Sequence, residues 1–248
     1  MQQNDMETNG QQTICLTAGV PRLPQVRLAE AATVTLGANE HIAIMGPNGA
    51  GKTLLADLLT GKYPLGEGTL VYDFRPSALA SAYDNIRTIA FRDTYGSADA
   101  NYYYQQRWNA HDQDDAPTVR QQLGPVKDEE HRRRLFDLFG LEPLMDKKII
   151  LLSSGELRKF QLAKALLTEP RVLVMDNPFI GLDADTRRLL NDLLERIART
   201  GAVQLVLVLS MLDDVPPFIT HVVSVAERRV GRKQTRDEYL AAFHQADA

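Results

Sequence analysis

The sequence predicts an α/β fold in which a mostly parallel sheet is flanked by helices. One observation is a set of short apolar runs without polar alternation, which is the pattern of strands buried on both faces of a parallel sheet. The runs lie at 41–45, 172–175, 205–209 and 222–225. The other observation is an amphipathic helical pattern over 186–200, with Gly201 following as a stop signal.

The chain of 248 residues is long enough for one large core that carries an inserted lobe. The stretch from Arg92 to about Pro117 has little apolar periodicity, whereas 118–150 has a helical pattern that ends near Gly140. The predicted parts are a flexible N-terminal extension (1–12), a core in two segments (13–92 and 170–232), a helical lobe (93–169) and a C-terminal tail (233–248).

Composition excludes several classes of protein. Hydrophobic residues make up 44% and charged residues 24%, the balance of a soluble globular protein, and the net charge of -4 argues against a nucleic-acid surface. Cys15 is the single cysteine, which excludes an intrachain disulfide and favours a reducing compartment. No apolar run reaches the roughly 18 to 20 residues of a membrane span. We therefore expect a cytoplasmic protein that reaches a membrane only through a partner.

The segment from Gly46 to Thr53 reads GPNGAGKT and has the strand before it and the helix after it that a phosphate-binding loop requires. Its glycines allow backbone N–H groups to turn toward a β-phosphate at the helix N-terminus. Lys52 is expected to neutralise phosphate oxygens, and the Thr53 hydroxyl to bind magnesium. The predicted nucleotide contacts are Gly46, Pro47, Asn48, Gly49, Ala50, Gly51, Lys52 and Thr53.

A second segment, 151–167, reads LLSSGELRKFQLAKALL and starts an amphipathic helix at its serines. Two interpretations fit: an anion site at the helix N-terminus, or a serine N-cap with a following acid. The position between the phosphate loop and VLVMD, with GLD soon after, favours the anion site. The candidate residues are Ser153, Ser154, Gly155 and Glu156.

These motifs together resemble the nucleotide-binding subunit of an ATP-binding cassette (ABC) protein, over about residues 13–230 and with most similarity to the ModF-like branch. The matches follow the family order: 46–53 the Walker A loop, 153–157 the signature, 172–176 Walker B, and 181–183 the D-loop. The resemblance implies a P-loop NTPase cassette with an antiparallel edge and an inserted helical lobe. It also implies that Mg-ATP is bound between two cassettes, each signature serving the nucleotide of its partner.

The resemblance assigns further roles. Asp176 joins Thr53 as a magnesium ligand, Asp183 belongs to the catalytic machinery, and Asp93 stands within a residue or two of a third metal-binding position. The family stacks an aromatic ring on adenine, but no Phe, Tyr or Trp precedes Tyr63. Either Arg22 or Pro21 covers the base, since a guanidinium stacks on a π-face, or the base contacts are weak.

Two hydrolytic positions depart from the family pattern. Asn177 stands where the family has the glutamate that accepts a proton from water, and Met211 stands where it has a histidine. A neutral amide cannot act as a base at neutral pH, and loss of a positioned base costs roughly 10²- to 10⁴-fold in rate. The substitutions predict a site that holds ATP better than it cleaves it, unless they are drift in a slow enzyme.

The leading hypothesis is an ATP-binding subunit of an ABC transport system. Its partners would be a second cassette and a membrane permease at the inner face of the plasma membrane. The alternative is a soluble ATP-dependent switch, whereas a DNA-repair ABC ATPase is disfavoured by the chain length and acidic balance. The aromatic residues Tyr102, Tyr103, Tyr104 and Trp108 would either contact the permease or pack within the lobe.

Overall fold

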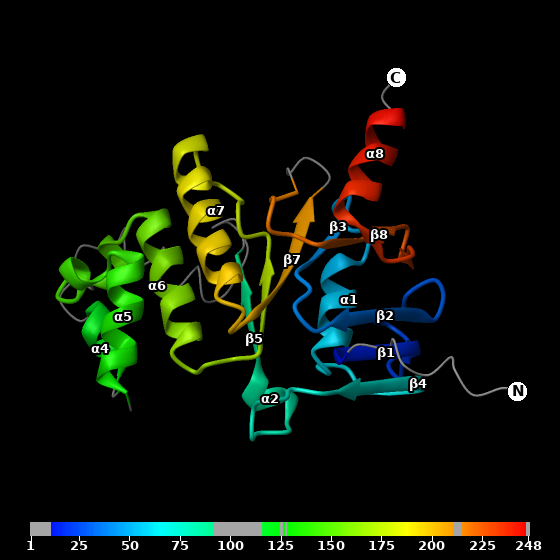
Figure 1. Cartoon of the computed structure of the whole chain (residues 1–248), viewed down its shortest axis with the longest axis horizontal. Helices are drawn as coiled ribbons and strands as arrows, with labels where there is room; N and C mark the ends of the chain where they lie inside the picture. The colour runs from blue at the N-terminus through cyan, green and yellow to red at the C-terminus, as the bar shows by residue number, and fades with distance from the viewer. Residues whose placement is uncertain (1–10, 92–115, 125, 127, 211–214, 247–248) are drawn as a thin grey trace, which may run out of the picture.

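The computed structural model describes residues 11–91, 116–124, 126, 128–210 and 215–246, and within them two sheets and the helices that cover them (Figure 1). The predicted site residues Asp93 and Met211, and the aromatic cluster at 102–108, lie outside the described residues.

The larger sheet has seven strands, ordered β10-β8-β3-β7-β6-β5, with β9 paired to β8. Five of these strands run parallel to one another, in the order β8-β3-β7-β6-β5. They are β3 (Ile42–Gly46), β5 (Ile86–Ala90), β6 (Val172–Asp176), β7 (Gln204–Ser210) and β8 (His221–Ala226). The two short strands β9 (Arg229–Val230) and β10 (Gln234–Thr235) pair antiparallel with β8. Every residue of β3 and of β6 is buried, as the continuous apolar runs predict.

The smaller sheet is antiparallel, in the order β2-β1-β4. Its strands are β1 (Gln12–Pro21), β2 (Ala32–Gly37) and β4 (Leu65–Tyr72). Helix α1 (Lys52–Leu59) contacts β1 of this sheet and β3 and β7 of the larger one, so it fills the space between the two sheets (Figure 1). The predicted α/β class with an antiparallel edge is confirmed.

The central strands divide their side chains between two cores because successive residues of a strand point to opposite faces. Ile42 and Ile44 belong to the core shared with α1, whereas Ala43 and Met45 belong to the core on the other face. That second core is covered by the helices of the middle of the chain, which Figure 1 shows beside the sheet. They are α4 (Val119–Leu123), α5 (Glu129–Phe139), α6 (Ser154–Leu166) and α7 (Ala184–Arg199), with 3₁₀ turns at Glu142–Leu144 and Ile149–Leu151.

Helix ends follow local chemistry. Gly140, in the left-handed conformation at φ 63°, ends α5 as the sequence predicts. Helix α7 begins two residues before the predicted span because the Asp183 side chain accepts a hydrogen bond from the Thr186 amide. The remaining helices are α2 (Ala82–Asn85) and α8 (Arg236–Ala246).

The two ends of the described chain are more regular than the sequence indicates. Strand β1 begins at Gln12, within the predicted extension, and the predicted tail from Lys233 onward contains β10 and α8. Tyr239 of α8 is buried in the core that β8 shares with the central strands. Over the described parts of the chain, none of the helices combines the length and the apolar composition needed to cross a bilayer.

His41, 8% exposed and directly before β3, is expected to make the stability of the fold depend on pH. Its Nδ1 accepts a hydrogen bond from the Leu205 amide at 3.1 Å, and burial lowers the pKa of the imidazole below its ordinary value despite a hydrogen bond to Ala198. The unfolded chain therefore binds the proton more readily, and stability present above the unfolded pKa is lost as pH falls toward the folded pKa. We expect the free energy of unfolding to fall as the pH is lowered from about 7.5 to about 5.5.

Urea unfolding at several pH values measures this slope. The variant His41→Asn, whose amide oxygen still accepts the Leu205 N–H, should lose much of the slope. Equal slopes in the native chain and His41→Asn would contradict the assignment.

Candidate functional site

The loop from Gly46 to Thr53 leaves the carboxyl end of β3 and enters α1, and its glycines are required by space and conformation. A Cβ at Gly46 would lie 2.0 Å from the Val225 carbonyl oxygen of β8, so any side chain there would displace the backbone. Gly49 and Gly51 have φ of 78° and 103°, which glycine adopts without a Cβ clash. The tip of the loop at 47–49 is exposed, and Ala50 is buried beneath it.

Lys52 is the buried cation of the loop, 6% exposed at the first turn of α1. Its Nζ donates hydrogen bonds to the carbonyl oxygens of Gly46 and Pro47 at 2.8 and 2.9 Å. The ammonium group is thus held inside the curve of the loop, where the N–H groups of the helix N-terminus also carry partial positive charge. This arrangement can bind an anion that enters from the exposed tip.

Thr53 and Asp176 meet at the edge of the loop although they are 123 residues apart in sequence. The Thr53 Oγ1 donates to Asp176 Oδ2 at 2.7 Å, and Asp176 ends β6 with 8% exposure. A hydroxyl and a carboxylate oxygen are hard ligands of the kind that Mg²⁺ takes, usually with phosphate and water oxygens completing its shell. The two side chains therefore fit the magnesium role that the sequence predicts.

Asn177 follows Asp176 directly and turns the chain sharply. Its backbone N–H donates to the Val208 carbonyl at 2.9 Å, and its φ is 54°. Asparagine enters this left-handed region more easily than most residues with a side chain. The local backbone therefore favours the asparagine found here, a feature that the sequence analysis did not detect.

The serines at 153 and 154 begin α6 as predicted, but Ser153 and Glu156 are engaged with each other. The Glu156 amide donates to Ser153 Oγ at 3.2 Å, and Glu156 Oε2 accepts from the Ser153 amide at 2.7 Å and from Lys147 Nζ at 2.8 Å. Burial acts to raise the pKa of Glu156, but the bonds from Lys147 and Ser153 outweigh it and lower that pKa. This is a capping box, and it leaves the exposed Ser154 and the half-buried Gly155 in the first turn.

The start of α6 touches the start of α7. A Cβ at Gly155 would lie 2.9 Å from Thr186 Cγ2, so the two helix ends approach closely. Asp183 accepts hydrogen bonds from the Thr186 amide and hydroxyl at 2.9 and 2.7 Å, and these bonds lower the pKa of its carboxyl. The structure therefore uses Asp183 as the N-cap of α7.

Arg158 is a further contact that the sequence analysis missed. It is 9% exposed, its guanidinium donates to the Ile180 carbonyl, and it lies 5.2 Å from the centre of the Phe91 ring. It links α6 to the segment that follows Asp176. The signal available in the sequence was an arginine on the apolar side of the helix predicted at 151–167.

Arg22 and Pro21 are placed by β4 rather than by the phosphate loop. The Arg22 amide donates to the Pro64 carbonyl at 2.9 Å, and Pro21 is buried in the small sheet. The segment that lies against the phosphate loop is 27–29, connected through Arg228. The Arg228 amide donates to the Ala50 carbonyl at 2.9 Å, and its carbonyl accepts from the Ala29 amide at 2.8 Å.

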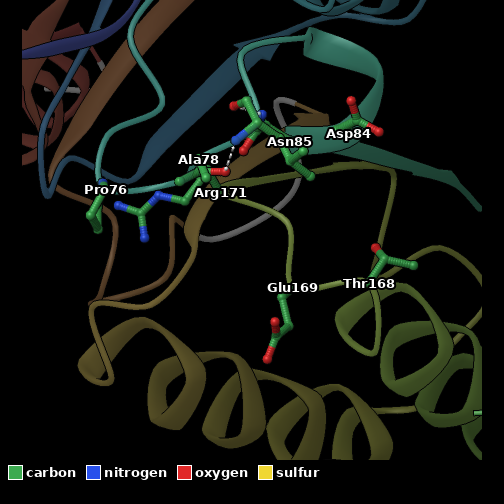
Figure 2. Close-up of a pocket in the computed structure, with 9 residues that line it drawn as sticks. Pro76, Ala78, Asp84, Asn85, Thr168, Glu169 and Arg171 are labelled. Carbon is green, nitrogen blue, oxygen red and sulfur yellow. Dashed lines mark hydrogen bonds between the residues drawn. The ribbon is translucent and has the colours of Figure 1, made fainter. Parts of the chain in front are cut away.

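Figure 2 shows a separate polar hollow at the other end of the sheet, where β5 and β6 begin. Asn85 Nδ2 donates there to the carbonyls of Leu79 and Ser81, and the Arg171 amide donates to the Asn85 carbonyl. Its polar groups hold loops together, and it is not joined to the loop at Gly46. The hollow is lined by Pro76, Ser77, Ala78, Leu79, Asp84, Asn85, Thr168, Glu169 and Arg171.

The chain is similar in sequence and in fold to known ABC transporter ATP-binding proteins. The family model described as ABC transporter matches residues 29–180. ModF of Escherichia coli, an ABC transporter ATP-binding protein, is 30% identical over 90% of this chain and 44% of its own length. The taurine import ATP-binding protein TauB of Pseudomonas fluorescens is 30% identical over 85% of this chain and 75% of its own length. The structure of cbiO1 from Clostridium perfringens, part of the cbiONQ transporter complex, matches with a TM-score of 0.72 at 20% identity, covering 93% of this chain and 91% of that one. The chain spans less than half the length of the first curated relatives that it matches.

The contact between Gly155 and Thr186 gives a test of the site's architecture. Glycine to alanine inside a helix is ordinarily stabilising, by up to about 1 kcal/mol. We expect Gly155→Ala to destabilise the chain by about 1 to 3 kcal/mol instead, because the added methyl overlaps Thr186 Cγ2.

Thr186→Ser removes that methyl group and keeps the hydroxyl that bonds Asp183, so it should rescue Gly155→Ala in a double-mutant cycle. Thermal unfolding of the four proteins measures the coupling. Additive effects would contradict the close approach.

Proposed function

This chain belongs to the ABC transporter family, and we propose that it is an ATP-binding subunit that holds Mg-ATP between itself and a second cassette. The observation that carries the proposal is the contact between the loop at 46–53 and the end of β6. Lys52 lies within the curve of a glycine-rich loop, and Thr53 bonds Asp176 at 2.7 Å beside it.

When the triphosphate binds, its oxygens would replace the present hydrogen-bond acceptors of Lys52. Lys52 would give up the carbonyl oxygens of Gly46 and Pro47 for β- and γ-phosphate oxygens, and the N–H groups at the start of α1 would face the β-phosphate. Thr53 and Asp176 would hold Mg²⁺, which neutralises developing charge on the phosphates when it is bound.

Hydrolysis in this chain's own site would be slow. The side chain at 177 is an amide, which orients water but accepts no proton at neutral pH. Asn177 occupies a left-handed backbone position, where glutamate would add strain. Met211 stands at the position that the family resemblance gives to a histidine, and its thioether is only a weak acceptor.

The surface of α6 that carries Ser154 and Gly155 would complete the nucleotide site of a partner cassette. ATP would favour the closed dimer because its γ-phosphate contacts both surfaces, and a ligand shifts an equilibrium through such differential contacts. Two copies of this chain would form two weakly hydrolytic sites. A partner with its own glutamate and histidine would give one active site and one that retains ATP.

We propose a role in transport because two similar proteins are described as parts of transport systems. TauB is named as an import ATP-binding protein, and the cbiO1 structure is described as part of a transporter complex. We propose that this chain likewise energises a membrane permease, from the inner face of the membrane and through contacts with that partner.

The chemistry at position 177 gives the main test. The purified chain should bind Mg-ATP, and Lys52→Ala should weaken binding strongly because the phosphate charge loses its partner. The variant Asn177→Glu with Met211→His should hydrolyse ATP about 10²-fold faster than the native chain, because it regains a base.

The matched control is Asn177→Gln with Met211→His, which has the same side-chain length and backbone strain but no carboxylate, and should stay slow. Phosphate release measures turnover, and calorimetric titration measures binding. Brisk hydrolysis by the native chain alone, or equal rates in the two double variants, would refute the proposal.

Recovery from membranes tests the transport role. Tagged chain expressed in its own cells should co-purify with a polytopic membrane protein, and the yield of that protein should change when ATP is replaced by a non-hydrolysable analogue. Recovery as a dimer that carries no membrane protein under either condition would favour an ATP-dependent switch instead.

A further inference from the structure

The hairpin formed by β8 and β9 is built directly against the phosphate loop. The Val225 carbonyl leaves space only for glycine at position 46, and the Arg228 amide donates to the Ala50 carbonyl at 2.9 Å. A Cβ at Gly51 would lie 3.5 Å from the Cα of Arg228 and 3.6 Å from its Cγ. The base of the Arg228 side chain therefore packs against the N-terminal end of α1.

The turn of this hairpin is conformationally costly for the residues that occupy it. Val225 pairs with Val230 and Ala226 with Arg229, so Glu227 and Arg228 are the two central residues. Both have positive φ, 49° and 63°. Two-residue hairpin turns of this kind favour Asn-Gly or Asp-Gly, and a residue with a long side chain in this region costs about 1 to 3 kcal/mol. Strain of this kind concentrates at functional sites, so the Arg228 side chain is a candidate for function.

The guanidinium of Arg228 reaches segment 27–29, which lies beside the loop. Arg228 is exposed, and its Nη1 donates to the Arg27 carbonyl at 3.4 Å, a long bond that a ligand can replace at little cost. The neighbouring Arg229 is paired with Glu30 at 3.2 Å. Arg228 thus stands between α1 and segment 27–29, beside the predicted triphosphate site.

We propose that Arg228 stacks on the face of the nucleobase of the bound nucleotide. This inference rests on the proposed function. In the proposed function Lys52, the loop and the metal ligands serve the phosphates, which leaves the nucleoside to meet the residues beside the loop, Arg228 and segment 27–29. No Phe, Tyr or Trp precedes Tyr63 in the sequence, and the backbone of Arg22 is bonded to Pro64 rather than to the phosphate loop. A planar guanidinium gives the base a π-stacking surface in place of a ring.

Stacking reads the face of a base and not its edge, so it discriminates poorly between purines. The chain should therefore bind Mg-GTP nearly as well as Mg-ATP. Removal of the guanidinium should weaken both nucleotides by about 5- to 30-fold, the usual effect of losing one stacking partner, and leave inorganic tripolyphosphate unaffected.

The test uses Arg228→Gly in the full chain, because glycine relieves the strain and keeps both backbone hydrogen bonds of residue 228. Glu227→Gly is the matched control: it relieves the same strain at the adjacent turn position but keeps the guanidinium. Both variants should unfold at a higher temperature than the native chain, and Arg228→Asn serves as a second variant that tolerates the same conformation. Calorimetric titration with Mg-ATP, Mg-GTP and Mg-tripolyphosphate measures binding.

Weaker nucleotide binding in Arg228→Gly, with unchanged tripolyphosphate binding and an unaffected Glu227→Gly control, supports the inference. Equal losses for all three ligands would make Arg228 a phosphate contact and would overturn the inference. Unchanged affinities in Arg228→Gly would overturn it as well. If the native chain bound tripolyphosphate and nucleotides equally, the base contact would be refuted while the phosphate loop stood. If it bound none of the three, the proposed function would fall as well.

Discussion

The hydrogen bond from Thr53 to Asp176 depends on the register of the central sheet. Gly46 is opposite Ser210 on β7, and Asp176 is opposite Val208 on the same strand. The pairing with β7 therefore fixes where the carboxyl ends of β3 and β6 lie relative to each other. A slip of one residue in either pairing would move an end by about 3.3 Å, more than a hydrogen bond of 2.7 Å tolerates. The same slip would also turn each side chain of the strand to the opposite face of the sheet. Alternate residues of these strands are packed in the two different cores, so the slip would disrupt both cores.

The second half of the site is joined to the first by close packing. Arg158 reaches from α6 to the Ile180 carbonyl, and Gly155 lies against Thr186 at the first turn of α7. Between these contacts runs the segment that begins at Asn177. Because packed elements transmit displacement through contiguous contacts, a force on the exposed start of α6 reaches the chain that follows Asp176. Contiguous contacts therefore link the surface proposed for a partner's nucleotide to Asp176, the proposed magnesium ligand.

The sequence predicted the parts of the molecule whose signals are local. The buried runs at β3 and β6, the glycine loop and the stop at Gly140 each depend on a few adjacent residues, and the family match confirms the resemblance drawn from the motifs. The small antiparallel sheet was harder to detect because β1 pairs on both edges and its register shifts interrupt simple alternation. Pairings between distant residues, such as Arg158 with Ile180 and Arg228 with Ala50, leave no periodic pattern in the sequence.

Ser153, Glu156 and Asp183 act in the structure as helix caps. A helix N-terminus presents N–H groups that the helix itself cannot bond, and a capping side chain or an anion can each satisfy them. Here the Ser153 and Glu156 side chains cap α6, and Asp183 caps α7. The caps fix the residue at which each helix begins.

Asn177 brings the conformational and chemical arguments together. The chain must turn sharply after Asp176, and its amide must reach the Val208 carbonyl, which together place residue 177 at a φ of 54°. A glutamate at that position would meet strain on the order of 1 to 3 kcal/mol, whereas an asparagine meets less. An enzyme that needs a base there would bear the strain for the sake of catalysis. A site of the proposed kind, which retains its nucleotide without cleaving it rapidly, would gain nothing from that strain, and the residue that suits the backbone would also suffice for its chemistry.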